Sequence, residues 1–178
     1  IFSIDRTTEG RNTHVFIDRM QDAIDNVEQV FTDNVAITRR LTEHMAVDAD
    51  KFSVLYQPVD FTKLIKTSTK EFENRPLRIL WAGRIDREKR PDNLIKIATK
   101  AKKEGLPLEF HVYGSPAFED HSYIHNIEES EAVIYHGPFE GGLGTLPLKE
   151  FDVFLLTSEW EGMPNVILEA ICGGLIVV

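Results

Sequence analysis

Two carboxylates, Glu161 and Glu169, flank the start of a helix that the sequence predicts from about residue 164 to residue 173. Pro164 suits the first helical position, because its fixed φ angle fits a helix and its missing N–H would have no helical partner there. Glu161 then lies in the loop before the helix and Glu169 on its first turns. A plain alternative is that both are solvated helix-end carboxylates, with Glu161 favoured by the helix dipole. From the helix alone we favour that alternative.

The backbone at this helix start could instead bind an anion. The N–H groups near Gly162, Met163 and Asn165 face the preceding loop, and the helix dipole adds roughly half a positive charge, which together favour a phosphate. Ionised carboxylates only accept hydrogen bonds and are repelled by an anion, so the natural partners of Glu161 and Glu169 are hydroxyl groups on either side of it. A nucleotide sugar offers sugar and ribose hydroxyls in this arrangement.

A second cluster of charges follows a predicted strand. Residues 77–83 are mostly apolar, and an amphipathic helix is expected from Pro91, with Arg84 and Lys89 between them. In parallel α/β sheets, ligands bind beyond the carboxyl ends of the strands. There Arg84 would provide a planar fork for phosphate oxygens and Lys89 a compact charge, which suits a diphosphate. The alternative is an ordinary solvated loop in which acidic neighbours balance the basic residues.

Together the two clusters resemble the donor domain of family-4 glycosyltransferases, which have the GT-B architecture. The resemblance rests on a strand ending in Gly83-Arg84, on Lys89 in the next loop, and on the apolar run 152–157 leading into the Trp-Glu-Gly-Met-Pro-Asn setting of Glu161 and on to Glu169. It covers residues 77–178 well and residues 52–60 more weakly. It implies a doubly wound, Rossmann-like parallel α/β sheet. It also implies an enzyme of hexosyltransferase type that transfers a sugar from a nucleoside diphosphate donor with retention at the anomeric carbon.

The resemblance further implies a role for each charged residue. Arg84, Lys89 and the helix-start N–H groups would stabilise the departing diphosphate, so that no metal or other cofactor is needed. Glu161 would orient sugar hydroxyls and Glu169 ribose hydroxyls. The Met-Pro-Asn after Glu161 resembles the same segment in enzymes that build bacterial surface polysaccharide from uridine-linked sugars. This resemblance slightly favours a UDP-sugar. The saccharide or lipid-linked acceptor would bind largely to an N-terminal domain, so this chain alone should bind donor weakly and transfer little.

The ends of the strands expected at 77–83, 108–114 and 132–136 supply further candidate donor contacts at Gly83, Gly114 and His136. The turn after Gly114 departs from the two-glycine form common in the family, which leaves its contact to base or ribose open. His136 lies where the resemblance puts the base-binding edge, although a partly buried structural histidine is the favoured interpretation. The glycine-rich stretch 141–144 lacks the Lys-Ser/Thr of a phosphate loop and is interpreted as a flexible lid or plain turn.

Composition narrows the function classes. The chain has 178 residues, 42% of them hydrophobic, which allows a sizeable core. Its formal net charge of -9 argues against a nucleic-acid partner, whose backbone calls for clustered Lys and Arg. Cys172 is the only cysteine, so no internal disulfide forms and a reducing compartment is expected. No apolar stretch reaches the ~18 residues of a membrane helix. We therefore expect a cytoplasmic protein, either free or peripheral on the cytoplasmic membrane face.

The order of the predicted elements indicates parts of two domains. Helices over 15–24 and 34–45, the second capped by Asp33, and strands over 29–32 and 53–56 come first. We place the boundary near Pro58, so residues 1–58 are the end of an N-terminal, acceptor-side domain and residues 59–178 the donor domain. Beyond Pro76 we expect strands at 77–83, 108–114, 132–136, 153–157 and 175–178, and helices at 91–104, 121–127, 147–150 and 165–173. Because Val178 falls inside a predicted strand, we expect a fragment that is incomplete at its C-terminus.

Other kinds of site fit less well. Asp48 and Asp50 match the two-carboxylate motif of metal-dependent sugar transferases but precede a strand instead of following one, so we predict a solvated turn and no metal. The histidines lack the spacing of zinc ligands. A nicotinamide-dependent oxidoreductase should carry a Gly-x-Gly-x-x-Gly turn where this chain has Gly83-Arg84. A non-catalytic nucleotide-sugar binding module stays open as an alternative, because it would keep the same fold.

Overall fold

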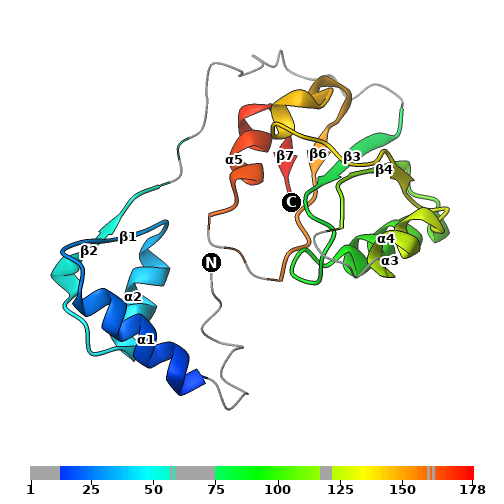
Figure 1. The fold of residues 1–178 in the computed structure, drawn as a ribbon. Coiled ribbons are helices and arrows are strands. Elements are labelled where there is room, and N and C mark those ends of the chain that lie inside the picture. The colour runs from blue at the N-terminus through cyan, green and yellow to red at the C-terminus, as the bar shows by residue number, and fades with distance from the viewer. Residues whose placement is uncertain (1–12, 57, 59–74, 117–121, 160, 162) are drawn as a thin grey trace. The chain divides into compact units, whose positions relative to one another are not determined.

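The computed structural model describes residues 13–56, 58, 75–116, 122–159, 161 and 163–178 (Figure 1). These residues fall into two compact units. The first lies within Ile1–Pro58 and takes in Glu161–Met163, and the second lies within Val59–Trp160 and Pro164–Val178.

The first unit is a small α/β arrangement. Its helices α1 (Thr13–Asp25) and α2 (Val35–His44) alternate with strands β1 (Val30–Thr32) and β2 (Phe52–Val54), and the 3-10 helix Ala49–Lys51 leads into β2. The two strands are parallel, with Val30 opposite Phe52. Ile24, Leu41 and Met45 form its buried core.

Side-chain caps fix two helix starts in this unit. The Asn34 side chain accepts the N–H of Ile37 at 2.9 Å, so Asn34 caps α2. The expectation that Asp33 would be the cap was wrong by one residue, because Asn34 is the last residue with extended backbone before the helix. Asp48 accepts the N–H of Asp50 at 3.0 Å and so caps the short 3-10 helix. Both aspartates are exposed, and their arrangement is that of a local turn.

The second unit is built on one parallel sheet. Its strands are β3 (Leu77–Ala82), β4 (Leu108–Tyr113), β5 (Ile134–Tyr135), β6 (Val153–Phe154) and β7 (Ile176–Val177). They lie in the order β5-β4-β3-β6-β7, and every neighbouring pair is parallel. The chain thus builds from β3 to one edge of the sheet and then returns to build the other side. This confirms the predicted α/β fold with a doubly wound parallel sheet.

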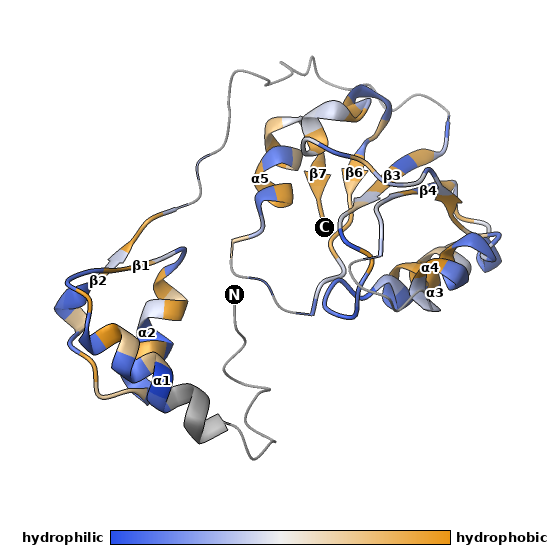
Figure 2. Ribbon diagram, viewed as in Figure 1, coloured by the Kyte–Doolittle hydropathy of each residue, from blue (hydrophilic) through white to orange (hydrophobic). Residues whose placement is uncertain are grey.

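Helices cover both faces of this sheet. Helices α3 (Pro91–Lys103) and α4 (Ser122–Glu128) pack on one face, and α5 (Asn165–Cys172) packs on the other with the 3-10 helices Leu143–Thr145 and Leu148–Glu150 (Figure 1). Side chains alternate along a strand. On β3, Ile79 and Trp81 therefore join the core under α3, while Leu80 and Ala82 join the core under α5. Figure 2 shows the resulting apolar layer in the strands β6 and β7.

Several elements are shorter than the sequence predicted. Strand β5 has two residues where 132–136 was expected, and β6 ends at Phe154 instead of residue 157. The reason is pairing, because β5 lies opposite only His111 and Val112, and β6 opposite only Ile79 and Leu80 on β3. The predicted helix at 147–150 is a single 3-10 turn.

Candidate functional site

The loops after β3 and β6 meet at the point where the strand order reverses. These two strands are neighbours, but the chain leaves β3 toward β4 and β6 toward β7, on opposite sides (Figure 1). In open parallel sheets, this switch point at the carboxyl ends of the strands is where ligands bind. Gly83, Arg84 and Lys89 follow β3, and Thr157 follows β6.

Two glycines pack backbone to backbone at the ends of β3 and β4. The Gly83 N–H donates to the Tyr113 carbonyl at 3.1 Å, and a Cβ placed on Gly114 would lie 2.1 Å from the Gly83 oxygen. A Cβ on Gly83 would meet no atom within 4 Å. Glycine at position 114 is therefore required by the close approach of the two turns, whereas Gly83 has open space beside it. A donor contact at either glycine stays a prediction.

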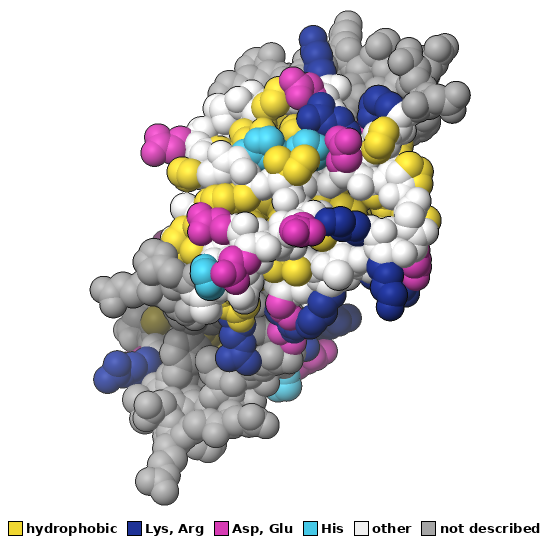
Figure 3. Space-filling view, turned by 90° about the vertical axis from the view of Figure 1, so that its right-hand side faces the viewer, with side chains coloured by type: hydrophobic (Ala, Val, Ile, Leu, Met, Phe, Trp, Pro, Cys, Tyr) yellow, Lys and Arg dark blue, Asp and Glu magenta, His cyan; other side chains and the backbone are white. Residues whose placement is uncertain are grey.

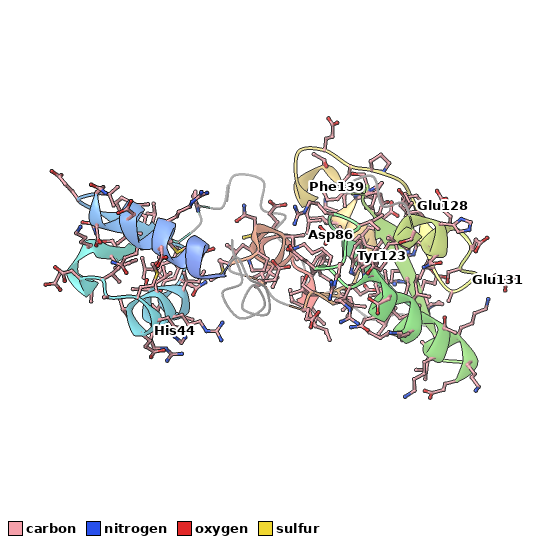
Figure 4. All side chains as sticks on the ribbon, turned by 60° about the horizontal axis from the view of Figure 1, so that its bottom comes forward. His44, Asp86, Tyr123, Glu128, Glu131 and Phe139 are labelled. Atoms are coloured by element: carbon pink, nitrogen blue, oxygen red, sulfur yellow. The ribbon has the colours of Figure 1, made fainter. Side chains whose placement is uncertain are left out.

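Asp86 joins the two predicted phosphate ligands. Arg84 Nε lies 3.3 Å from Asp86 Oδ2 and its Nη2 lies 3.4 Å from Glu88 Oε2, with the Arg84 side chain 58% exposed. Asp86 Oδ1 accepts the backbone N–H of Lys89 at 3.0 Å. Figure 4 labels Asp86 in this loop. The pair with Glu88 is exposed on both sides, and such a pair is worth about 0–1 kcal/mol. Asp86 is only 13% exposed. An anionic ligand could therefore replace Glu88 as a partner of Arg84 at small cost.

Arg90 also belongs to this loop, although the sequence analysis did not single it out. Its backbone is left-handed, with φ 51° and ψ 54°, and its guanidinium donates to both Asp92 oxygens at 2.9 Å. It also donates to Glu159, after β6, at 3.3 Å. The hydrogen bonds from Arg90 hold the pKa of Asp92 well below its usual range. The available signal was the order Arg90-Pro91-Asp92, which sets a basic residue before the proline that begins α3.

Glu169 is fastened to the glycine-rich loop. It lies half-buried on α5, and its Oε2 accepts the N–H of Leu143 at 2.5 Å. A Cβ on Gly142, whose φ is 82°, would lie 2.8 Å from the same oxygen. The stretch 141–144 is therefore a turn that contacts α5, in agreement with the plain-turn alternative given above.

The other residues of the first cluster are divided between the units. Asn165 is exposed and begins α5, after Pro164 at the N-cap. Glu161 and Met163 are half-buried and belong to the first compact unit, and Gly162 lies outside the described residues. The second unit thus brings the loop of Arg84 and Lys89 into the same compact body as Asn165 and Glu169.

His136 lies in a stack of rings beyond β5. Its ring is nearly parallel to those of Tyr113 and His111, with centroids 4.5 Å and 5.2 Å away. Arg78 Nε donates to His111 Nε2 at 3.3 Å, so the proton of the neutral His111 ring is on Nδ1, which lies 2.9 Å from His136 Nε2. His136 is exposed, whereas a partly buried histidine was the favoured interpretation. Stacking, and not enclosure, fixes this ring.

The surroundings of this pair disfavour protonation. Desolvation by packed neighbours lowers the pKa of both the buried His111 and the exposed but stacked His136, and the positive charge of Arg78 lowers both further. Figure 3 shows histidines on a face where acidic and basic side chains are interspersed. Both effects favour the neutral form of the two rings.

Known proteins match this chain in sequence. Residues 76–178 match the family described as glycosyl transferases group 1. A Klebsiella pneumoniae protein, described as an uncharacterized 41.2 kDa protein in a cps region, is 30% identical over 146 residues, covering 75% of this chain and 38% of that protein.

Solved structures match it in fold. The pneumococcal O-GlcNAc transferase GtfA, in complex with UDP and GlcNAc, is 27% identical with a TM-score of 0.65, over 90% of this chain and 31% of that one. HepE of Anabaena, in complex with UDP-glucose, is 16% identical with a TM-score of 0.75, over 98% of this chain and 50% of that one. The fold is therefore that of GT-B glycosyltransferase structures.

The chain spans only part of these proteins, 38% of the Klebsiella relative and 31% and 50% of the two solved chains. Within the described ranges, none of the helices has the length and apolar character needed to cross a membrane. The family match extends over more than half of the chain and contains every residue of the two charge clusters. The chain belongs to the glycosyl transferases group 1 family.

Proposed function

We propose that the protein containing this chain transfers a sugar from a nucleoside diphosphate sugar to an acceptor, and that the second unit binds the donor. The observation that carries this proposal is the loop after β3, where Asp86 joins Arg84 and Lys89 beside the switch point of a group 1 family sheet. Two cations in one loop, with open space at Gly83 beside Arg84, suit a diphosphate, which carries charge and needs close approach to the backbone.

In the proposed reaction, Arg84 and Lys89 stabilise the charge that develops on the diphosphate as its bond to the sugar breaks. Of the backbone donors predicted ahead of α5, the Met163 N–H donates to Asp33 Oδ2 at 3.3 Å, so a phosphate would have to take the place of that carboxylate. The positive charges of Arg84 and Lys89 and the backbone donors take the place of a metal ion. We further propose that the reaction is of the family-4, retaining kind and that the transferred group is a hexose.

The carboxylates and strand ends then hold the rest of the donor. Glu161 orients hydroxyls of the transferred sugar, and Glu169 binds the ribose. A carboxylate has about four acceptor positions, so Glu169 can keep its bond to Leu143 and still accept ribose hydroxyls. Gly114, His136 and Asn165 complete the proposed contacts. His136 supports a place for the base, because it is exposed and its ring is fixed by stacking on Tyr113.

The relatives support a choice of donor and setting. The structures of GtfA with UDP and of HepE with UDP-glucose favour UDP as the carrier. The cps region of the Klebsiella relative favours a role in polysaccharide or glycolipid synthesis. The saccharide or lipid-linked acceptor would bind mainly to an N-terminal domain, in the cytoplasm or at its membrane face.

Calorimetric titration of the full-length protein with UDP, GDP and ADP tests the donor site. Arg84→Ala and Glu169→Ala should each weaken the preferred diphosphate about tenfold, since each loses a charged hydrogen-bonding group. Arg87→Ala is the matched control, because it removes the same charge from the same loop at an exposed residue outside the proposed site. If no nucleoside diphosphate bound, or if Arg84→Ala behaved like Arg87→Ala, the site assignment would be wrong.

Two further titrations separate the alternatives. Tight binding of NAD without binding of any nucleoside diphosphate would indicate an oxidoreductase. Binding of a nucleotide sugar without hydrolysis or transfer by the full-length protein would indicate a non-catalytic binding module.

A further inference from the structure

A chain of hydrogen bonds runs through Thr157 from the core to the loop after β3. Trp81 is 3% exposed on β3, and its indole N–H donates to Thr157 Oγ1 at 2.8 Å. The Thr157 hydroxyl in turn donates to the backbone carbonyl of Lys89 at 2.7 Å. The segment after β6 thereby holds the backbone of a residue in the neighbouring loop.

This position requires a hydroxyl. The indole N–H of Trp81 only donates and the Lys89 carbonyl only accepts, so the group between them must accept one hydrogen bond and donate the other. A single threonine or serine oxygen does both. A valine has almost the same shape as Thr157 but can do neither.

Lys89 is held on its other side as well. Its backbone N–H donates to Asp86 Oδ1 at 3.0 Å, so side chains engage both polar groups of this residue's backbone. The same loop is joined to the segment after β6 by the Glu159 N–H, which donates to the Glu88 carbonyl at 2.9 Å, and by the pairing of Arg90 with Glu159. The direction in which the Lys89 side chain leaves the backbone is therefore set by Thr157 and Asp86.

We propose that Thr157 is a positioning residue for Lys89, holding it where the diphosphate of the donor binds. The proposal rests on the proposed function of this site and adds to it a residue that acts only through another. A cation that is fixed before the ligand arrives loses less conformational freedom on binding. It also needs no rearrangement when charge develops on the diphosphate. Removing the Thr157 hydroxyl should thus weaken recognition of the diphosphate and leave recognition of the nucleoside unchanged.

The test compares UDP with uridine as ligands of the full-length protein. Thr157→Val should lower the affinity for UDP about fivefold, the value of one hydrogen bond, and leave the affinity for uridine unchanged. Thr157→Ser keeps the hydroxyl and should restore UDP binding to within about twofold of the natural protein. Equal losses for UDP and uridine would show a merely structural role and overturn the proposal.

A double-mutant cycle tests the route through Lys89. In a Lys89→Ala background, Thr157→Val should cost no further UDP affinity, and an undiminished loss would overturn the proposal. Failure of the natural protein to bind UDP or any other nucleoside diphosphate would instead overturn the proposed function, so the two failures are distinguishable.

If Thr157→Val does not fold, Trp81→Phe removes the first donor and leaves the hydroxyl in place. It should lower UDP affinity relative to uridine, and an unchanged ratio would overturn the proposal.

Discussion

Asp152, just before β6, is a carboxylate whose side chain is 0% exposed. Its two oxygens accept from Arg75 Nη2 and Nη1 at 2.8 Å and 2.7 Å, and one of them also accepts the Arg78 backbone N–H at 2.9 Å. The Arg75 side chain is 40% exposed. The pair is asymmetric, because the cation reaches solvent while the anion does not. Removing the Arg75 cation should therefore lower the free energy of unfolding more than neutralising Asp152 does.

We predict that Arg75→Ala lowers the free energy of unfolding by about 3 kcal/mol, because it leaves the buried Asp152 carboxylate without its guanidinium. Asp152→Asn keeps an acceptor oxygen and should cost about 1–2 kcal/mol. Urea unfolding measures both. Arg39→Ala is the control, since its ion pair with Glu43 joins side chains that are 71% and 58% exposed, and it should change the free energy by less than about 0.5 kcal/mol. Equal costs for the two Arg75–Asp152 variants would contradict the asymmetry.

At the scale of elements, the paired turns after β3 and β4 give matched variants. Gly114→Ala would place a Cβ 2.1 Å from the Gly83 oxygen and must push two hydrogen-bonded strands apart, so we expect a loss of about 2–4 kcal/mol. Gly83→Ala meets no atom within 4 Å and should unfold at nearly the same temperature. Thermal unfolding checks this pair, and a Gly114→Ala protein as stable as the natural one would contradict it. If the donor approaches the backbone at Gly83, Gly83→Ala should also lose UDP affinity despite its unchanged stability.

Sequence reasoning succeeded where side-chain pattern and backbone agree. The apolar run at 77–82 predicted β3, and helix-start signals at Pro91 predicted α3, because burial and capping leave marks on residue types. The clustering of Arg84 and Lys89 beyond a strand followed from the same logic. It failed for Thr157, which was assigned to a strand. Strand β6 ends at Phe154, the N–H groups of Leu155 and Leu156 still donate to Leu80 and Val178, and the Thr157 hydroxyl donates to the Lys89 carbonyl, a tertiary contact that the apolar pattern does not mark.

At the scale of the whole molecule, stability should depend on pH through His111 and His136. Desolvation by packed neighbours lowers their pKa in the folded protein, whereas their pKa in the unfolded chain is about 6.5. Between these values the unfolded chain binds more protons, so the free energy of unfolding rises with pH. The contribution of the neutral rings is complete above about pH 6.5 and is lost as the pH falls below it toward the lowered values. The charged or titratable neighbours of the rings are Arg78, Glu109, Glu150 and Tyr113.

Urea unfolding from about pH 5 to about pH 8 tests this dependence, a range that spans the titration of histidine. The natural protein should lose stability toward acid more steeply than a variant carrying both His111→Gln and His136→Gln. The carboxylates titrate in both proteins. Subtracting one curve of unfolding free energy against pH from the other therefore removes their contribution. Curves that stay parallel below pH 6.5 would contradict the prediction.

The contact between Glu169 and Leu143 makes two different demands on one position of the chain. The Leu143 side chain is 0% exposed, so the core selects an apolar residue there, while the carboxylate uses only its N–H. Any apolar residue except proline satisfies the carboxylate equally well. The hydrogen bond between the loop of Leu143 and helix α5 therefore depends on the length of the loop and on the direction of its backbone. Relatives can keep it while their residues at this position differ, and an alignment of residue types would pass over it.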